Sequence, residues 1–142
     1  MLHALITQRE GQNMYGKSTD VLEAAYTEFY ESMGIRLHPV SNFTRDFEAL
    51  FEDPIDVLIV TGGGTLHPKY YVEPHKAELQ PHRDAMEERL IMYCVENEIP
   101  IIGVCRGMQH LNALFGGKIT EFPAVKFCDQ NLTTIHHKDV RI

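Results

Sequence analysis

An apolar run that ends abruptly in a cysteine flanked by glycines is the feature that most limits how this chain can fold. Within the stretch Ile99 to Gly117, the run Ile101 to Val104 leads directly into Cys105, and Gly103 and Gly107 flank the cysteine as G-x-C-x-G. This spacing is the cysteine version of the G-x-S-x-G nucleophile elbow, in which a strand turns sharply into a helix. Glycines are needed on both sides because a Cβ would clash in so tight a turn.

Cys105 has the placement of a nucleophile. At the bend its side chain would project into open space, and the start of the following helix would bring the positive end of the helix dipole to the sulfur, which favours thiolate over thiol. Cysteine is also among the most buried residue types, so a structural role is the alternative. The preceding strand and the following helix favour the catalytic interpretation.

The rest of the chain alternates between strand and helix patterns. Strands are expected at 2–6, 35–40, 57–60 and 100–104, and an amphipathic helix at 83–97 with Met86, Leu90 and Cys94 on its apolar face. The unbroken apolar run at 57–60 is typical of a parallel sheet that is buried on both faces. This alternation predicts an α/β fold with a doubly wound, mainly parallel sheet. Shorter strands are expected at 118–119 and 137–142, and a short helix around 47–51.

The first helix is predicted from a capping signal followed by helical spacing. Three capping side chains occur at 18–20, and Gly34 is expected to end the helix. Between them, apolar residues recur at the spacing of one helix face: Leu22, Ala25, Phe29 and Met33.

A glycine-rich segment, Thr61 to Thr65, directly follows the strand at 57–60. In a doubly wound sheet the site forms beyond the carboxyl ends of the strands, so this segment and Cys105 can meet there. The backbone N–H groups of Gly63 and Gly64, together with that of Arg106, would then be aimed at a developing oxyanion. A simple turn and a phosphate nest are the alternatives.

A second motif competes with this interpretation, because Gly11 to Ser18 matches the P-loop pattern G-x-x-x-x-G-K-S letter for letter. Four polar residues separate it from the first strand, however, and its interior is bulky. The strand at 57–60 also ends in Thr61 rather than in a magnesium-binding aspartate. We therefore favour a loop leading to a helix cap over nucleotide hydrolysis.

Composition narrows the classes of function. A length of 142 residues with 44% hydrophobic residues suits one globular domain, and a net charge of −7 argues against binding nucleic acid or an anionic membrane. No apolar segment reaches membrane-spanning length, and no signal peptide is recognisable. The 3 cysteines form no C-x-x-C pair, and the 8 histidines are scattered. This pattern predicts a reducing cytoplasm and no disulfide framework, metal site or cofactor.

At these residues the chain resembles the class I glutamine amidotransferases, specifically their γ-glutamyl hydrolase branch, peptidase family C26. The segment IPIIGVCRGMQHLNALFGG at 99–117 is similar to the elbow signature of that branch, and DVLIVTGGGTLHPKYY at 56–71 is similar to its oxyanion loop. The segment AAYTEFYESMGIRLHPVSN at 24–42 resembles its first helix and second strand. The resemblance implies a flavodoxin-like fold and a Cys-His-Glu triad.

The resemblance also implies a reaction. The thiolate of Cys105 would attack the γ-carbonyl of a small γ-glutamyl amide, cleave its C–N bond through a γ-glutamyl thioester and release glutamate. Gln109, Thr65 and Tyr70 would bind the substrate, which is a γ-glutamyl amine or a γ-glutamyl-linked nucleotide such as a CDP-amidate. The alternatives are a glutaminase subunit that delivers ammonia to a synthetase partner, and a non-catalytic binding protein on the same fold. The sequence is also compatible with a homo-oligomer.

The resemblance leaves the base of the triad unassigned. The histidine and glutamate of the family belong to a C-terminal segment that residues 1–142 do not contain, and the ending HHKDVRI resembles the strand before that segment. His136 and His137 are therefore poor substitutes. We expect residues 1–142 to form a single amidotransferase-like domain that lacks its C-terminal segment.

The loop after the glycine-rich segment carries basic residues that are candidates for binding a phosphorylated leaving group. They are His75, Lys76, His82 and Arg83. A solvated loop is the alternative, and we favour it.

Overall fold

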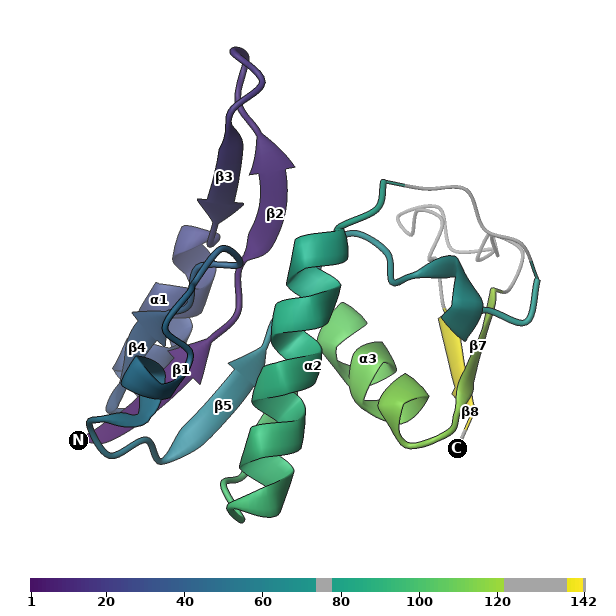
Figure 1. The fold of residues 1–142 in the computed structure, drawn as a ribbon. Coiled ribbons are helices and arrows are strands. Elements are labelled where there is room, and N and C mark those ends of the chain that lie inside the picture. Colours follow the sequence, from purple (N-terminus) through teal and green to yellow (C-terminus); the bar gives the residue numbers. More distant parts are fainter. Residues whose placement is uncertain (74–77, 122–137, 142) are drawn as a thin grey trace, which may run out of the picture.

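A four-stranded parallel sheet forms the centre of the computed structural model, which describes residues 1–73, 78–121 and 138–141 (Figure 1). The strands lie in the order β4-β1-β5-β6, and every pairing is parallel. Their bounds are Leu2–Ile6 for β1, Ile35–Pro39 for β4, Val57–Val60 for β5 and Ile101–Gly103 for β6. The predicted α/β class, with a mainly parallel flavodoxin-like sheet, is confirmed.

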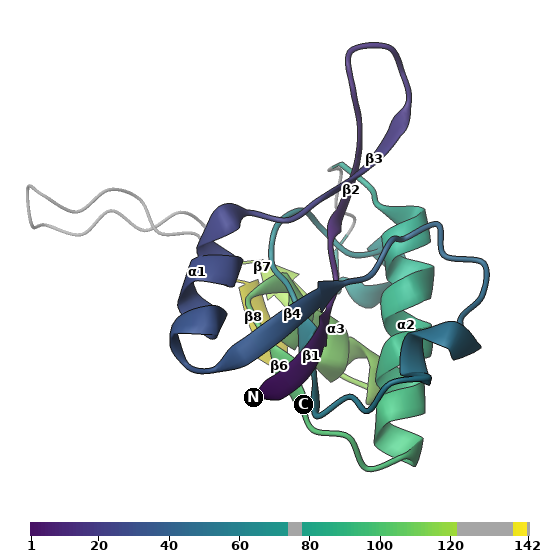
Figure 2. The same cartoon turned by 90° about the vertical axis from the view of Figure 1, so that its left-hand side faces the viewer.

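Helices cover both faces of this sheet. Helix α1 (Ala24–Ser32) lies on one face, and α2 (Pro81–Glu96) and α3 (Arg106–Leu114) lie on the other, together with the 3-10 helix η1 (Glu48–Phe51) (Figure 2). The larger core lies between the sheet and α2. Its buried members come from β1, β5, α2 and the segment that joins β4 to η1: Leu5, Val40, Phe47, Leu58, Val60, Met86, Leu90, Ile91 and Cys94.

Helix α2 follows the predicted pattern. Its apolar stripe of Met86, Leu90 and Cys94 is buried against the sheet. Burial raises the pKa of the Cys94 thiol to about 11, so this cysteine is a packing residue that stays protonated at neutral pH.

The predicted apolar stripe of α1 is wrong. The helix begins at Ala24, after Leu22, and Phe29 and Met33 are 58% and 52% exposed. Leu22 packs against the sheet from before the helix, as predicted, but within α1 the contacts come from Tyr26 and the buried Tyr30, which lie four residues apart with their rings stacked. Because a tyrosine carries a large apolar ring below its hydroxyl, these two residues occupy the face that we had assigned to their neighbours.

The segment that matches the P-loop pattern forms an antiparallel hairpin. Strands β2 (Arg9–Gln12) and β3 (Ser18–Val21) pair with each other and project beyond the main sheet (Figure 1). The side chain of Asn13 closes the turn by accepting hydrogen bonds from the N–H groups of Tyr15 and Lys17, at 2.9 and 3.0 Å. A phosphate cradle needs a helix directly after the loop, so the nucleotide interpretation is wrong, and so is the predicted helix cap.

The end of the described chain forms a separate antiparallel pair. Strand β7 (Lys118–Glu121) pairs with β8 (Lys138–Arg141) beside α3, which confirms strands at these two predicted positions. Cys128, His136 and His137 lie outside the described residues. Among the helices that the structure describes, none combines the length and hydrophobicity needed to cross a bilayer.

Candidate active site

Cys105 stands at a strained turn between β6 and α3. It is exposed and has φ 52° and ψ −105°, in a region of backbone conformation that costs a residue with a side chain about 1–3 kcal/mol. A Cβ at Gly107 would lie 2.0 Å from the carbonyl oxygen of Val60, and one at Gly103 would lie 2.8 Å from the backbone nitrogen of Met108. Both flanking glycines are therefore sterically required, as the elbow motif predicts.

The glycine-rich segment lies directly against this turn. A Cβ built on Gly62 would be 3.3 Å from the Cβ of Cys105, so the two predicted parts of the site meet at the carboxyl edge of the sheet. Gly63 and Gly64 have φ 88° and 81°, which glycine adopts without the cost that other residues bear. The side chain of Arg9, from the hairpin, occupies the space in which a Cβ on Gly63 would lie, with its Nε atom 2.8 Å from that position.

The two segments that meet at Cys105 contain three backbone N–H groups without a hydrogen-bond partner among the described residues. Within the described part of the chain, the N–H groups of Gly63, Gly64 and Arg106 donate to no other group. The Arg106 N–H belongs to the first turn of α3, where helical N–H groups have no partner within the helix. The neighbouring Gly62 N–H donates to the hydroxyl of Tyr26 at 3.0 Å. These unpaired donors are what an oxyanion hole requires, and the role assigned to them stays a prediction.

The residues predicted to bind substrate lie in different surroundings. Gln109 is 4% exposed, and its Oε1 atom has no hydrogen-bond partner among the described residues. Thr65 is buried, and its hydroxyl donates to the carbonyl of Glu78 at 3.0 Å. The ring of Tyr70 is half-buried beside the ring of His110, with centroids 6.0 Å apart. Their roles in binding substrate stay predictions.

A buried carboxylate beneath the site was not anticipated from the sequence. Glu87 of α2 is fully buried. Its Oε1 atom forms an ion pair with Arg106 and lies 2.9 Å from Nδ1 of His110. Its Oε2 atom accepts a hydrogen bond from the hydroxyl of Thr7 at 2.8 Å. Burial alone would raise the pKa of Glu87. The hydrogen bond from His110 and the charges of Arg106 and Arg83 outweigh this and lower that pKa to about 2. Since an ionised carboxylate only accepts, Nδ1 of His110 carries the proton.

The side chain of Arg106 joins the elbow to this buried group. It is 1% exposed, pairs with both Glu87 and Asp84, and donates through Nε to the carbonyl of Thr65 at 3.3 Å. Burial raises the pKa of Asp84 even though Arg106 lies next to it. One sequence signal could have indicated this buried network: three charged residues, at positions 83, 84 and 87, begin a helix that was expected to present an apolar face.

Of the four candidate phosphate-binding residues, the structure describes His82 and Arg83, and both are engaged with other groups of the protein. Arg83 is fully buried, and the Nδ1 atom of His82 lies 2.6 Å from the carboxylate of Glu10. His75 and Lys76 lie outside the described residues. Within the part that the structure describes, no side chain hydrogen-bonds to the Cys105 sulfur, and no group of three or more His, Cys, Asp and Glu residues could hold a metal ion.

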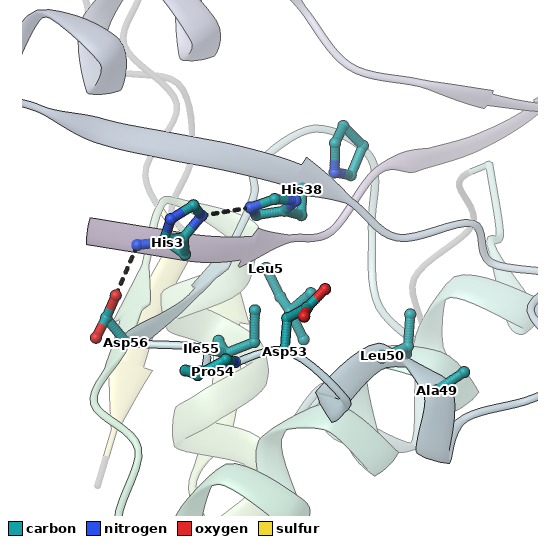
Figure 3. Close-up of a pocket in the computed structure, with 10 residues that line it drawn as sticks. His3, Leu5, His38, Ala49, Leu50, Asp53, Pro54, Ile55 and Asp56 are labelled. Carbon is teal, nitrogen blue, oxygen red and sulfur yellow. Dashed lines mark hydrogen bonds between the residues drawn. The ribbon is translucent and has the colours of Figure 1, made fainter. Parts of the chain in front are cut away.

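A second hollow lies near the amino end of β1. It is a cavity of about 510 Å³ whose lining includes His3, His38, Asp53 and Asp56. Figure 3 shows the rings of His3 and His38 directed at each other. Nδ1 of His3 lies 2.8 Å from Nε2 of His38. Among the described residues, no cysteine, serine or threonine lines this cavity, and it lies away from Cys105, which follows the carboxyl end of β6.

Comparison with known families places the chain in one of them. A model of the family described as peptidase C26 matches residues 2–140, nearly the whole chain. The chain belongs to the peptidase C26 family. Its relatives include proteins that are named as γ-glutamyl hydrolases and as glutamine amidotransferase-like.

Individual relatives of this C26 protein match about half of its residues. The glutamine amidotransferase-like protein YvdE of Lactococcus lactis is 41% identical over 68 residues, which are 46% of this chain and 29% of YvdE. The γ-glutamyl-γ-aminobutyrate hydrolase of Escherichia coli O157:H7 is 32% identical over 75 residues, or 48% and 28% of the two chains. The γ-glutamyl-CDP-amidate hydrolase of Campylobacter jejuni is 33% identical over 66 residues, or 46% and 30%. The chain spans less than a third of the length of these relatives.

Proposed function

We propose that this chain carries the nucleophile and the oxyanion hole of a cysteine-dependent hydrolase that cleaves small γ-glutamyl amides. The observation that carries the proposal is the contact between the glycine-rich segment and the strained, exposed Cys105, together with N–H groups in both segments that have no partner among the described residues. A cysteine held at such a turn is costly in conformational energy, and strain of this kind clusters at functional sites.

The proposed reaction proceeds through a thioester. The Cys105 thiolate attacks the γ-carbonyl, and the N–H groups of Gly63 and Arg106 donate to the oxyanion that forms. The C–N bond breaks, the amine leaves with a proton from a histidine, and water then attacks the γ-glutamyl thioester to release glutamate and the thiol. The histidine is proposed to come from outside the described residues, because the buried His110 is committed to Glu87.

The substrate is proposed to be a γ-glutamyl amine without a phosphate. Two relatives are named for the hydrolysis of γ-glutamyl-γ-aminobutyrate and γ-glutamyl-CDP-amidate. The second substrate carries phosphates, and the described candidates for binding them, His82 and Arg83, are engaged with Glu10 and with the protein interior. A reducing cytoplasm, which keeps Cys105 reduced, remains the proposed location.

A comparison of products tests this function. We expect the purified protein to release glutamate and the amine in equal amounts from γ-glutamyl-γ-aminobutyrate, measured by mass spectrometry, and to leave the α-glutamyl isomer intact. Efficient release of ammonia from glutamine, with no cleavage of γ-glutamyl amines, would identify a glutaminase that serves a synthetase. Absence of glutamate from every γ-glutamyl compound would identify a binding protein.

A further inference from the structure

One buried guanidinium binds three consecutive carbonyl groups of the glycine-rich segment. Nη2 of Arg83 donates to the carbonyls of Thr61 and Gly62, at 2.8 and 2.9 Å, and Nη1 donates to that of Gly63 at 2.7 Å. The Arg83 side chain is fully buried, so water does not compete for these bonds. The rigid fork of an arginine suits several acceptors at once, which a lysine ammonium on a flexible stem does not reproduce.

The guanidinium is itself held from two sides. Its Nε donates to Glu87 at 3.0 Å, and its Nη1 donates to Oε1 of Gln80 at 3.1 Å. Gln80 in turn donates to the carbonyl of Gly63 at 3.3 Å. The Gln80 side chain also occupies the space next to Gly64, where a built Cβ would lie 1.8 Å from its amide nitrogen. Arg83 is thus a fixed support for a segment that glycines would otherwise leave flexible.

The direction of the carbonyls determines the direction of the N–H groups. In a trans peptide unit the C=O of one residue and the N–H of the next point in opposite directions. Holding the carbonyls of Thr61, Gly62 and Gly63 on the Arg83 side therefore turns the N–H groups of Gly62, Gly63 and Gly64 to the other side. The Gly62 N–H has this direction, because it donates to the hydroxyl of Tyr26 on the side of the segment away from Arg83. Gly62 itself lies against Cys105.

We propose that Arg83 is the positioning residue of the oxyanion hole. It holds the carbonyl groups of the glycine-rich segment so that the N–H groups of Gly63 and Gly64 face the reacting carbonyl. The inference rests on the proposed function. Arg83 itself touches neither the substrate nor Cys105. Its effect is on the transition state, where oxyanion charge develops, and much less on binding of the uncharged γ-amide.

Arg83→Lys is the test variant, because it keeps a positive charge beside Glu87 but cannot reach three carbonyls. We expect kcat to fall about 100-fold, the scale of a displaced oxyanion donor, with KM within about threefold of wild type. Hydrogen–deuterium exchange should rise at 61–65 and stay unchanged in β1 and β5. Arg89→Lys, on the exposed side of the same helix, is the matched control and should behave as wild type in both measurements.

A rescue experiment separates positioning from a general loss of structure. In Arg83→Ala, added methylguanidine should raise kcat, whereas an equal concentration of urea should not.

Unchanged exchange at 61–65 in Arg83→Lys would overturn the proposal, and so would a wild-type kcat in that variant. If the wild-type protein itself releases no glutamate, the proposed function fails, and the exchange measurement still decides whether Arg83 holds the segment.

Discussion

Replacing Cys105 with serine is expected to lower the turnover of γ-glutamyl amides by at least about 10⁴-fold, the scale seen when a hydrolase loses its nucleophile. A serine hydroxyl is a far weaker nucleophile than a thiolate unless a base is arranged for it. The substitution preserves the shape of the side chain, so substrate binding should remain within a few-fold of wild type. Steady-state glutamate release and calorimetric titration with a γ-glutamyl amide measure the two quantities.

Cys105→Gly should abolish turnover and also stabilise the fold. Glycine adopts φ 52° at no steric cost, and the side chain that is lost is exposed, so we expect the free energy of unfolding to rise by about 1 kcal/mol. A higher midpoint in urea for Cys105→Gly than for Cys105→Ser would show that the turn is strained to present the thiol. Wild-type turnover in either variant would contradict the nucleophilic role.

Glu87→Gln is expected to produce the largest loss of stability, about 3–5 kcal/mol in the free energy of unfolding, because it breaks a buried ion pair from one side. The buried guanidinium groups of Arg83 and Arg106 would lose their common counter-charge, and Asp84 would be left as the nearby carboxylate. Urea unfolding at pH 7 measures the loss. Glu88→Gln, the exposed neighbour on the same helix, is the control and should change stability by less than about 0.5 kcal/mol.

The same carboxylate predicts how stability depends on pH. The pKa of Glu87 is about 2 in the folded protein, below its ordinary value of 4.5. A depressed carboxyl pKa stabilises the fold at pH values above 4.5, and this contribution is lost as the pH falls from 4.5 towards 2. Wild type should therefore lose more stability than Glu87→Gln over this interval. Equal acid sensitivity of the two proteins, or a Glu87→Gln variant as stable as Glu88→Gln, would contradict this account of the network.

The parts of the site that could be read from the sequence are those that short-range geometry dictates. Gly103 is required by contacts with Leu111 and Met108 of the following helix, and Gly107 by the carbonyl of Val60 on the neighbouring strand, which the elbow always approaches in a parallel sheet. The contact between the glycine-rich segment and Cys105 follows from the carboxyl edge that their two strands share. The parallel sheet followed from unbroken apolar runs at strand length.

The parts that could not be read depend on partners distant in the sequence. Besides Arg83, four residues before it on the same helix, Glu87 contacts residues 7, 106 and 110, and no local spacing reveals these three. The hairpin formed by β2 and β3 was missed because a polar segment without alternation carries no strand signal, whereas Asn13 and backbone pairing stabilise it. The apolar residues of α1 do not mark its buried face, because the rings of Tyr26 and Tyr30 pack against the sheet there.

The most direct test of the central claim is covalent labelling by a diazo-ketone analogue of glutamine, read by peptide mass spectrometry. An electrophile carried by a γ-glutamyl-like group should modify Cys105 of the native protein and leave the buried Cys94 unmodified. Excess γ-glutamyl-γ-aminobutyrate should protect Cys105, and the Cys105→Ser variant should take up no label. An unmodified Cys105 in the native protein, or labelling that the γ-glutamyl compound does not slow, would contradict the assignment of Cys105 as the nucleophile of a γ-glutamyl hydrolase.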